Sequence, residues 1–545
     1  MKPLSSRLST LFTFIETQSL TYPLFSAAFL SLLIARILLE NWLFGFKARS
    51  ALLFWYEFSH LSLFFLSAFL IFFLLLRQII PEVTRRANIL LFGFLVILLP
   101  PIIDFWLSGG SGFWSFYSFD SLSGLFHRYI TFFGDRPDFG ITYGVRVEVA
   151  IVTLFLTLFV FIKTKRVIQT SLFAILSYTT LFFLGTFPSW VSYAVLSHSS
   201  GITSIRDTNI AALFLSPTHL FFQSSPGLQL ALSLKMGLVY ASLLPFLIGI
   251  TLFFTWKPIF LALFQNVRWP QVLYHSGLFT IGIGLGALLS GTTFSFSFFE
   301  ILATWVSLIA VIAAWIASVI VNDFFDESID RETNHNRPLP TRSISHGHYR
   351  AIGITFFVFS LFLAAIPNFL GAFFLLAYQG VAWIYSAPPF RLKRFPIIAT
   401  SVSAIASFLV LMVGFSLSAK PESLSNIPLS LVFLLLLAYT LALPLKDFKD
   451  IEGDREAHVW TIPVLFGVFR SKLIIGSGIF LSFLASVFFL KSTTLFIPSL
   501  LAGSASFWII LSMRERRGAI HARNIFWWIL ALTTLYGLYA VTVVL

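Results

Sequence analysis

The chain has 545 residues, of which 57% are apolar and only 11% are charged, against about 25% charged in an average globular protein. This composition excludes a soluble protein, and the absence of cysteine excludes disulfides, thiolate metal sites and cysteine nucleophiles. The net charge of +13 is explained first by basic cytoplasmic loops of a membrane protein rather than by nucleic-acid binding. Apolar runs of about 20 residues recur without period-two alternation, which predicts an all-α polytopic membrane protein.

The first 256 residues predict a helical membrane domain of about six spans. No secretory cleavage site follows the first apolar segment, so we expect a retained first span. A shorter apolar stretch, 210–222, contains Pro217 and is interpreted as interfacial or re-entrant. The Gly- and aromatic-rich loop 109–145 is expected to lie on the membrane surface facing away from the cytoplasm. The expected spans are 20–39, 51–76, 88–108, 146–162, 168–187 and 229–255.

This first domain carries ionisable residues in no spacing that indicates a known chemistry. They are Glu57, His60, Asp104, Glu148 and His219, of which Glu57 and His60 share a helix face. We interpret these residues as interhelical hydrogen-bonding groups. The role of the domain is therefore unknown, and a non-catalytic scaffold for an unidentified protein partner is the hypothesis for it.

A linker at 257–270 separates this domain from a second one at 271–545. Nine apolar segments fit the second domain and predict a nine-helix bundle. They are 271–290, 297–321, 351–366, 369–385, 397–418, 428–445, 472–490, 493–512 and 524–543.

The basic residues between these segments predict the orientation of the bundle. Alternate loops hold 16 Lys and Arg residues, whereas the intervening loops hold only Lys420 and Lys491. The basic set should face the cytoplasm, so we expect an integral protein of the cytoplasmic (plasma) membrane of a prokaryote. The basic loops are 323–350, 387–396, 446–472 and 513–523.

Two acidic windows of ten residues begin at the ends of the second and sixth of these segments. They are identical at six of ten positions and lie 124 residues apart, which indicates an internal repeat. In each window three aspartates are spaced i, i+3, i+7, within about 60° of arc on one helix face. The aspartates are Asp323, Asp326 and Asp330 in the first window and Asp447, Asp450 and Asp454 in the second.

Six converging carboxylates require cations, because their mutual repulsion and desolvation are otherwise unfavourable. Without cysteine or paired histidine, oxygen ligands favour Mg²⁺ over zinc, and a magnesium ion keeps open positions that suit diphosphate oxygens. A single such window is about as often a solvated charge cluster, balanced here by Arg331 or Arg455. Two matched windows at a membrane edge favour a functional site.

A basic stretch ends the fourth segment of the second domain and reads Tyr-Ser-Ala-Pro-Pro-Phe-Arg-Leu-Lys-Arg from Tyr385 to Arg394. Its two prolines stop the helix. Arg391, Lys393 and Arg394 then lie at the membrane face that carries the aspartates. These cations suit a departing diphosphate, although alone they would indicate an ordinary positive-inside loop.

Together these three patterns resemble the UbiA-type intramembrane prenyltransferase family. The first window, from Asn322 to Arg337-Pro338, is similar to the family motif Asn-Asp-x-x-Asp-x-x-x-Asp with its trailing Arg-Pro. The second window and the Tyr-Ser-x-Pro-Pro-x-Arg-Leu-Lys stretch also resemble family motifs, especially in digeranylgeranylglyceryl phosphate synthase and chlorophyll synthase members. The resemblance covers about residues 266–545 and agrees with a nine-helix UbiA-like bundle. The family's usual asparagine on the first helix is missing, and His275 is the nearest polar substitute together with Ser276.

The resemblance implies Mg²⁺-dependent transfer of an isoprenyl group from its diphosphate to a lipid, aromatic or tetrapyrrole acceptor in the membrane. It implies that all six aspartates hold the magnesium ions, and that Tyr385 faces the allylic cation or hydrogen-bonds the diphosphate. The other residues implied to bind, orient or neutralise the substrate are Arg268, Asn322, Arg391, Lys393 and Arg394.

A cation-coupled transporter is the alternative function, since acidic residues on paired repeats also form ion pathways. The aspartates, however, lie at one membrane face rather than near the bilayer midplane. Transport also leaves the Tyr-Ser-x-Pro-Pro stretch unexplained. The sequence therefore favours the enzyme and leaves its acceptor and prenyl chain length open.

Overall fold

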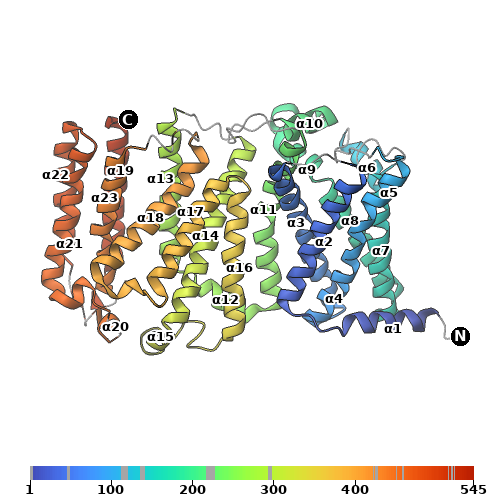
Figure 1. The fold of residues 1–545 in the computed structure, drawn as a ribbon, viewed down its shortest axis with the longest axis horizontal. Coiled ribbons are helices and arrows are strands. Elements are labelled where there is room, and N and C mark those ends of the chain that lie inside the picture. Colours follow the sequence, from blue (N-terminus) through green and yellow to red (C-terminus); the bar gives the residue numbers. More distant parts are fainter. Residues whose placement is uncertain are drawn as a thin grey trace. The chain divides into compact units, whose positions relative to one another are not determined.

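The structure, a computed structural model, divides into two compact units: Met1–Phe260 with Ser297–Leu302, and Leu261–Phe296 with Ala303–Leu545 (Figure 1). The residues that it describes are 4–45, 50–111, 121–134, 141–216, 228–291, 297–420, 423, 427–449, 451–456, 459–513, 515–516, 519–520 and 522–544.

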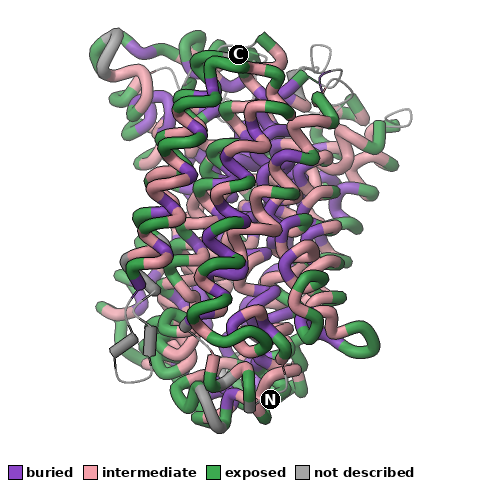
Figure 2. The backbone as a smooth tube through the Cα atoms, turned by 90° about the vertical axis from the view of Figure 1, so that its left-hand side faces the viewer, coloured by how far each residue is buried: buried purple, intermediate pink, exposed green. Residues whose placement is uncertain are grey.

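Both units are built of helices, and 14 helices within the described ranges are long and apolar enough to cross a membrane. The only strands in that part of the chain are β1 (Glu515–Arg516) and β2 (Ala519–Ile520), which pair antiparallel. Buried and exposed positions alternate along the helices (Figure 2), as expected where one face packs in a bundle and the other meets lipid. The predicted all-α polytopic membrane fold is confirmed.

Six of the spanning elements lie in the first unit, and each coincides with a predicted span. They are α2 (Tyr22–Leu43), α3 (Ala51–Leu75) with η1 (Leu76–Gln78), α4 (Val83–Gly93) with η2 (Phe94–Leu98) and α5 (Leu99–Leu107), α7 (Tyr143–Thr164), α8 (Val167–Gly185) and α11 (Leu228–Thr255). The shorter elements are α1 (Leu4–Glu16), α6 (Leu122–Ile130), α9 (Phe187–Ser200), η3 (Ile202–Ser204) and α10 (Asp207–Leu215).

The third span changes pitch in its middle because of two prolines. Pro100 and Pro101 each lack an N–H, and their rings crowd the carbonyls of Val96 and Ile97 four residues earlier. The chain adopts the tighter 3₁₀ pitch of η2 at this point and then continues as α5. The span thereby remains one element from Val83 to Leu107.

Two predicted features of the first unit fall partly outside the described residues. The expected interfacial stretch 210–222 is described only as far as the end of α10 and Ser216, so Pro217 and His219 lie outside. The expected surface loop 109–145 contains α6.

The second unit takes in the nine predicted segments, each of them helical, although the first residues of α14 are grouped with the first unit. Eight of them are among the 14 helices long and apolar enough to cross a membrane, whereas the described apolar part of the ninth, Trp527–Val543, is shorter. These helices are α13 (Trp269–Leu289), α14 (Phe298–Phe325), α16 (His346–Ala365), α17 (Phe369–Ser386), α18 (Pro396–Ser418), α19 (Leu429–Ala442) with η6 (Leu443–Lys449), α21 (Ile462–Phe489), η7 (Thr493–Leu495) with α22 (Phe496–Leu511), and α23 (Ala522–Val544). Shorter helices are α12 (Lys257–Asn266), α15 (Glu327–Thr333), η4 (Leu392–Arg394) and α20 (Ile451–Glu456). α12 occupies most of the predicted linker, and the chain passes from one unit to the other inside it.

Helices α13 and α18 approach each other backbone to backbone. A Cβ added at Gly282 would lie 2.0 Å from the carbonyl oxygen of Leu411, and one at Gly414 would lie 1.9 Å from that of Phe279. Glycine therefore fits this contact where larger residues do not, as is usual where membrane helices pack closely. The hydroxyl of Ser418 donates to the carbonyl of Ile283 across the same interface (2.6 Å).

Helix α21 begins at Ile462, earlier than the predicted segment 472–490, and contains a break at Gly467. This glycine has φ 73° and ψ 167°, a combination essentially restricted to glycine. The break separates a short turn after Ile462 from the long apolar run that follows.

Candidate active site

The two acidic windows lie at the same end of the second unit. The first window spans the end of α14 and α15, and the second spans η6 and α20. Helix α15 contacts α20, which brings the windows together (Figure 1). Carboxylates 124 residues apart in sequence thereby gather at one edge of the bundle.

Asp323, in the last turn of α14, is 1% exposed and accepts four hydrogen bonds. Its Oδ1 accepts from the guanidinium groups of Arg268 (2.8 Å) and Arg337 (3.2 Å). Its Oδ2 accepts from the amide of Asn266 (2.6 Å) and the hydroxyl of Tyr349 (2.8 Å). Because a carboxylate offers about four acceptor positions, this aspartate is fully satisfied by protein donors.

Asp326 lies between α14 and α15 and faces a different set of cations. Its Oδ1 accepts from Arg391 (2.9 Å), and its Oδ2 pairs with the ammonium group of Lys393. Lys393 also donates to the side-chain oxygen of Asn322 (3.0 Å), to which the hydroxyl of Ser386 donates in turn (3.2 Å). The predicted basic stretch therefore meets the first window directly, through two of its three cations.

Asp330, on α15, is buried and pairs with Arg337, which also binds Asp323. Asn334 donates to its other oxygen (3.2 Å). Burial raises the pKa of Asp330, and the nearby charges of Asp323 and Asp326 act in the same direction, whereas Arg337 lowers it. Arg337 thus ties the first and third aspartates to one side of the window.

The expectation of three aspartates on one continuous helix face is only approximately met. The backbone at Asp326 has φ −109° and ψ 7°, which ends α14 and starts α15. Asp323 and Asp330 share Arg337, but Asp326 points to the cations of the basic stretch.

Two of the cationic residues of the site, Arg268 and Arg391, have a left-handed backbone conformation. Arg268 caps α13 with φ 58°, and Arg391 precedes η4 with φ 42°. Such conformations cost on the order of 1–3 kcal/mol for a residue with a side chain and are held by their surroundings. Lys393 is buried near Arg391, and burial lowers the pKa of Lys393 while Asp326 opposes that change.

In the second window the structure describes Asp447 and Asp454, whereas Asp450 lies outside the described residues. Both described aspartates are half-buried. Phe448 is buried in a core cluster with Ile475 and Ile479, which fixes the position of the window.

Tyr385 lies beside this second window, at the end of α17. The ammonium group of Lys446, next to Asp447 in sequence, lies 5.9 Å from the centre of the Tyr385 ring. Arg394 is exposed to solvent, and no ion pair is recorded for it within the described part of the chain.

Three residues that contact the aspartates were not among the predicted site residues: Asn266, Arg337 and Tyr349. Arg337 belongs to the Arg-Pro pair that follows the first window, but its sequence position does not predict which aspartate it contacts. Asn266 and Tyr349 carry no spacing signal, since they lie 57 and 26 residues from Asp323. His275, the substitute for the missing asparagine, bonds the carbonyl of Gln271 in its own helix (2.7 Å).

The donor chemistry at this edge fits a hard cation, because the ligands offered are carboxylate oxygens. The described residues contain no group of three or more His, Asp or Glu side chains in an arrangement that would hold a metal. Asp323 has no acceptor position left, whereas each oxygen of Asp326 and Asp330 accepts a single recorded bond or ion pair. Asp326 and Asp330 therefore fit a cation, and Asp323 does not.

A family model described as the UbiA prenyltransferase family matches residues 277–530. Residues 277–530 form a UbiA prenyltransferase domain. The UbiA domain lies in the second unit except for Ser297–Leu302, which are grouped with the first. The site residues Asn266 and Arg268 come just before the matched range.

The chain is also similar to curated proteins and to solved structures. It is 29% identical to digeranylgeranylglyceryl phosphate synthase of Methanoregula boonei over 29% of this chain and 55% of that protein. It is 32% identical to homogentisate phytyltransferase of Synechocystis sp. over 32% of this chain and 62% of that protein. The chain thus spans little more than half the length of these relatives, and neither of them is named as a transporter.

Among solved structures, the chain resembles a UbiA homologue from Archaeoglobus fulgidus bound to DMAPP and Mg²⁺. The identity is 21% and the TM-score 0.40, over 52% of this chain and 99% of that one. A second structure of a UbiA homologue from the same organism, bound to GPP and Mg²⁺, gives 19% identity and a TM-score of 0.41.

Proposed function

We propose that this protein is an intramembrane prenyltransferase, which uses Mg²⁺ to transfer an isoprenyl group from an isoprenyl diphosphate to a membrane-soluble acceptor. The observation that carries the proposal is the pairing of Asp326 with Arg391 and Lys393 at the edge where α15 meets α20. Carboxylates for a metal and cations for a diphosphate are thereby adjacent. The names of the relatives support a lipid or an aromatic acceptor, and a tetrapyrrole acceptor remains part of the proposal.

Magnesium would be held by Asp326 and Asp330 of the first window and by the aspartates of the second, which are Asp447, Asp450 and Asp454. When bound, it would neutralise charge on the diphosphate. Asp323 is assigned a positioning role instead, because its four hydrogen bonds fix Arg268 and Arg337 beside the site. Asn322 orients Lys393 through its side-chain oxygen.

The cations of this chain would stabilise the departing diphosphate. Arg391 and Lys393 donate to Asp326 in the structure, and the same donors suit phosphate oxygens. Fixed positive charges lower the barrier most where charge accumulates on the leaving group in a water-poor site. Tyr385, next to Lys446, would face the allylic cation or bond the diphosphate, and exposed Arg394 would act in substrate capture.

The protein is an integral membrane protein, and we propose that the site faces the cytoplasm of a prokaryotic cell. The support is the 16 Lys and Arg residues in the loops on the aspartate side, against two in the intervening loops. A tag placed in the 387–396 loop should therefore be accessible to a membrane-impermeant reagent only from the cytoplasmic side.

The direct test incubates the purified full chain with Mg²⁺, isoprenyl diphosphates of several lengths and three acceptor classes, and identifies products by mass spectrometry. The acceptor classes are glyceryl phosphate lipids, aromatic acids and tetrapyrrole acids. Asp326→Asn protein is the matched control. Failure to form any prenylated product with a folded protein, across all donors and acceptors, would refute the proposal.

A further inference from the structure

The first unit contains a cavity that the proposed function does not use. It has a volume of about 160 Å³ and is bordered mainly by α3, α4 with η2, and α7. Its lining on α3 runs from His60 to Phe72, and on α7 from Val145 to Leu156. At about 1.5 Å per residue, these stretches are about 18 and 16 Å long.

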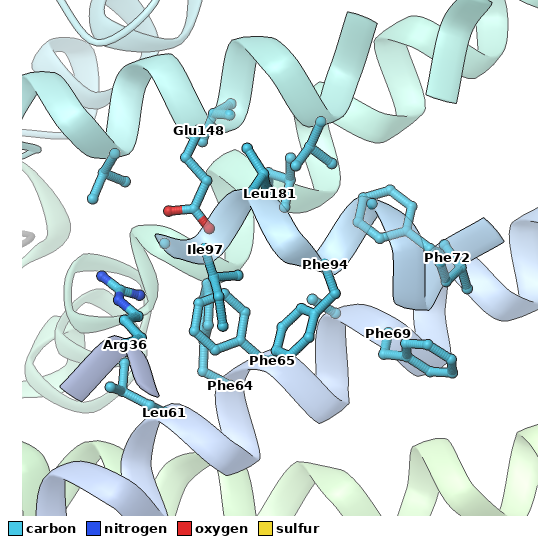
Figure 3. A pocket seen from close by; sticks show the side chains of 18 of the residues that line it. Arg36, Leu61, Phe64, Phe65, Phe69, Phe72, Phe94, Ile97, Glu148 and Leu181 are labelled. Carbon is cyan, nitrogen blue, oxygen red and sulfur yellow. The ribbon is translucent and has the colours of Figure 1, made fainter. Parts of the chain in front are cut away.

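The volume and the length together define the shape of a suitable ligand. An engineered cavity of about 150 Å³ holds one benzene ring. Here a similar volume extends along about three helical turns, so the cavity is narrow and has room for at most one hydrocarbon chain. The walls are rich in phenylalanine, among them Phe65, Phe69, Phe72 and Phe94 (Figure 3).

The polar residues lining the cavity gather at one end. Figure 3 shows the carboxylate of Glu148 and the guanidinium of Arg36 turned toward each other, away from Phe69 and Phe72. Glu148 is 9% exposed and Arg36 is 8% exposed. His60 lies at the same end of the α3 lining, with its ring stacked on that of Tyr240 at 5.9 Å.

The polar side chains at this end lie close to one another but form no hydrogen bond or ion pair in the described part of the chain. No ion pair or hydrogen bond is recorded there for the side chains of Arg36, Glu148 or His60, and the Nε of Arg36 is a buried donor without an acceptor. The guanidinium of Arg36 lies over the face of the Phe65 ring, 5.5 Å from its centre. Buried ionisable groups in a membrane domain are costly and are functional by default.

We propose that this cavity binds an uncharged amphiphile: a single hydrocarbon chain with a hydroxyl head, seated with the hydroxyl between Arg36 and Glu148. One hydroxyl accepts from a guanidinium and donates to a carboxylate at the same time. An anionic head would be repelled by Glu148, and a cationic head by Arg36. The chain then extends along α3 and α7 to Phe72 and Leu156.

The chemistry is shared by isoprenyl alcohols and alkyl alcohols, and one experiment distinguishes them. The purified full chain in detergent is photolabelled with a dodecanol that carries a diazirine at its tail end, and labelled peptides are mapped by mass spectrometry. Farnesol, dodecanol, dodecane and laurate are added as competitors. The expected label is saturable and lies around Phe69 and Phe72, and the better-competing alcohol identifies the type of tail.

Head recognition is tested by the competitors and by variants. Dodecane and laurate should compete at least about tenfold less well than dodecanol, the loss expected for one hydrogen bond to a charged group. Glu148→Gln and Arg36→Met should weaken labelling by a similar factor. The exposed pair Glu82 and Arg85 provides matched controls, Glu82→Gln and Arg85→Met, which should leave labelling unchanged.

Equal competition by dodecane and dodecanol would overturn the proposal, because it would show an apolar cavity without head recognition. Labelling that does not saturate, or that spreads over the lipid-facing helices, would also overturn it. If the variants fail to fold, as judged by size-exclusion chromatography, the ranking of competitors on the wild-type chain decides alone.

Discussion

Two aspartates three positions apart, Asp323 and Asp326, have different hydrogen-bond partners, and we propose different roles for them for that reason. Asp323 has all its acceptor positions filled by Arg268, Arg337, Asn266 and Tyr349. Asp326 is held by two cations, Arg391 and Lys393, and keeps acceptor capacity. The residue type alone does not separate a positioning carboxylate from a metal ligand, and the assignment proposed for these two aspartates is based on their hydrogen bonds.

This difference predicts different consequences for two conservative substitutions. Asp326→Asn should reduce turnover at least about 100-fold, the loss usual for one essential transition-state contact, with little change in Tm. Asp323→Asn should instead lower the free energy of unfolding by about 3 kcal/mol, because it leaves Arg268 without its buried counter-charge and Arg337 with Asp330 alone. Turnover by mass spectrometry and thermal melting in detergent measure the two effects.

The matched control is Glu452→Gln, an exposed carboxylate within the second window, which should change neither quantity. If Asp326→Asn kept more than about a tenth of wild-type turnover, its assignment to the metal would be wrong.

Metal removal should stop the reaction without unfolding the protein. All the assigned ligands are carboxylates, so EDTA should abolish turnover and Mg²⁺ or Mn²⁺ should restore it, whereas a zinc-selective chelator should have no effect. The melting temperature should stay the same in EDTA, because the aspartates of the first window are neutralised by protein cations. Full turnover in EDTA would contradict the proposed function and would favour the transporter hypothesis, which cation flux in liposomes would then test.

At the level of single residues, the sequence predicted Asn322 and the aspartates of the first window, and also the cations Arg268, Arg391 and Lys393. The structure brings these cations into contact with the first window. Their assignment to a metal and a diphosphate stays a prediction. The contacts of Tyr349 and Asn266 could not be predicted, because tertiary packing alone brings them to Asp323.

At the level of helices, apolar runs predicted the position of every span because a bilayer fixes their length. The details that were not predicted depend on local backbone geometry. Examples are the 3₁₀ turn before Pro100, the break at Gly467 and helix α12 inside the expected linker. Hydropathy is insensitive to each of these features.

The contact between α13 and α18 predicts a strong effect of side-chain size. Gly414→Leu should separate these helices, because its Cβ alone would lie 1.9 Å from the carbonyl oxygen of Phe279. We expect a loss of at least about 3 kcal/mol in stability, measured by thermal melting in detergent. Gly284→Leu is the control, since a Cβ there meets nothing within 4 Å. Equal melting temperatures for the two variants would show that the helices do not pack this closely.

At the level of the whole molecule, the recognisable chemistry lies in one of the two units. A truncated chain that begins at Gln265 retains Asn266, Arg268 and the UbiA domain, so it should retain prenyl transfer. It should be less stable, because Phe299 is buried and grouped with the first unit, where its ring lies 4.9 Å from the ammonium of Lys235. Expressing the two halves separately and measuring the turnover and the melting temperature of each tests both expectations.

A folded but inactive carboxyl-terminal half, reactivated by adding the amino-terminal half, would show that the first unit contributes to the reaction. Its accessory role, and the domain division proposed from the sequence, would then need revision.

The carboxylates of the first window already have protein counter-ions. Its three carboxylates already face four protein cations, Arg268, Arg337, Arg391 and Lys393, so free magnesium meets little net negative charge there. A diphosphate that draws Arg391 and Lys393 onto its own oxygens would release Asp326 at the moment when the metal needs it. Calorimetry should therefore find that Mg²⁺ and inorganic pyrophosphate each bind weakly alone and bind tightly together. Equal Mg²⁺ affinity with and without pyrophosphate would argue against this ordered loading of the site.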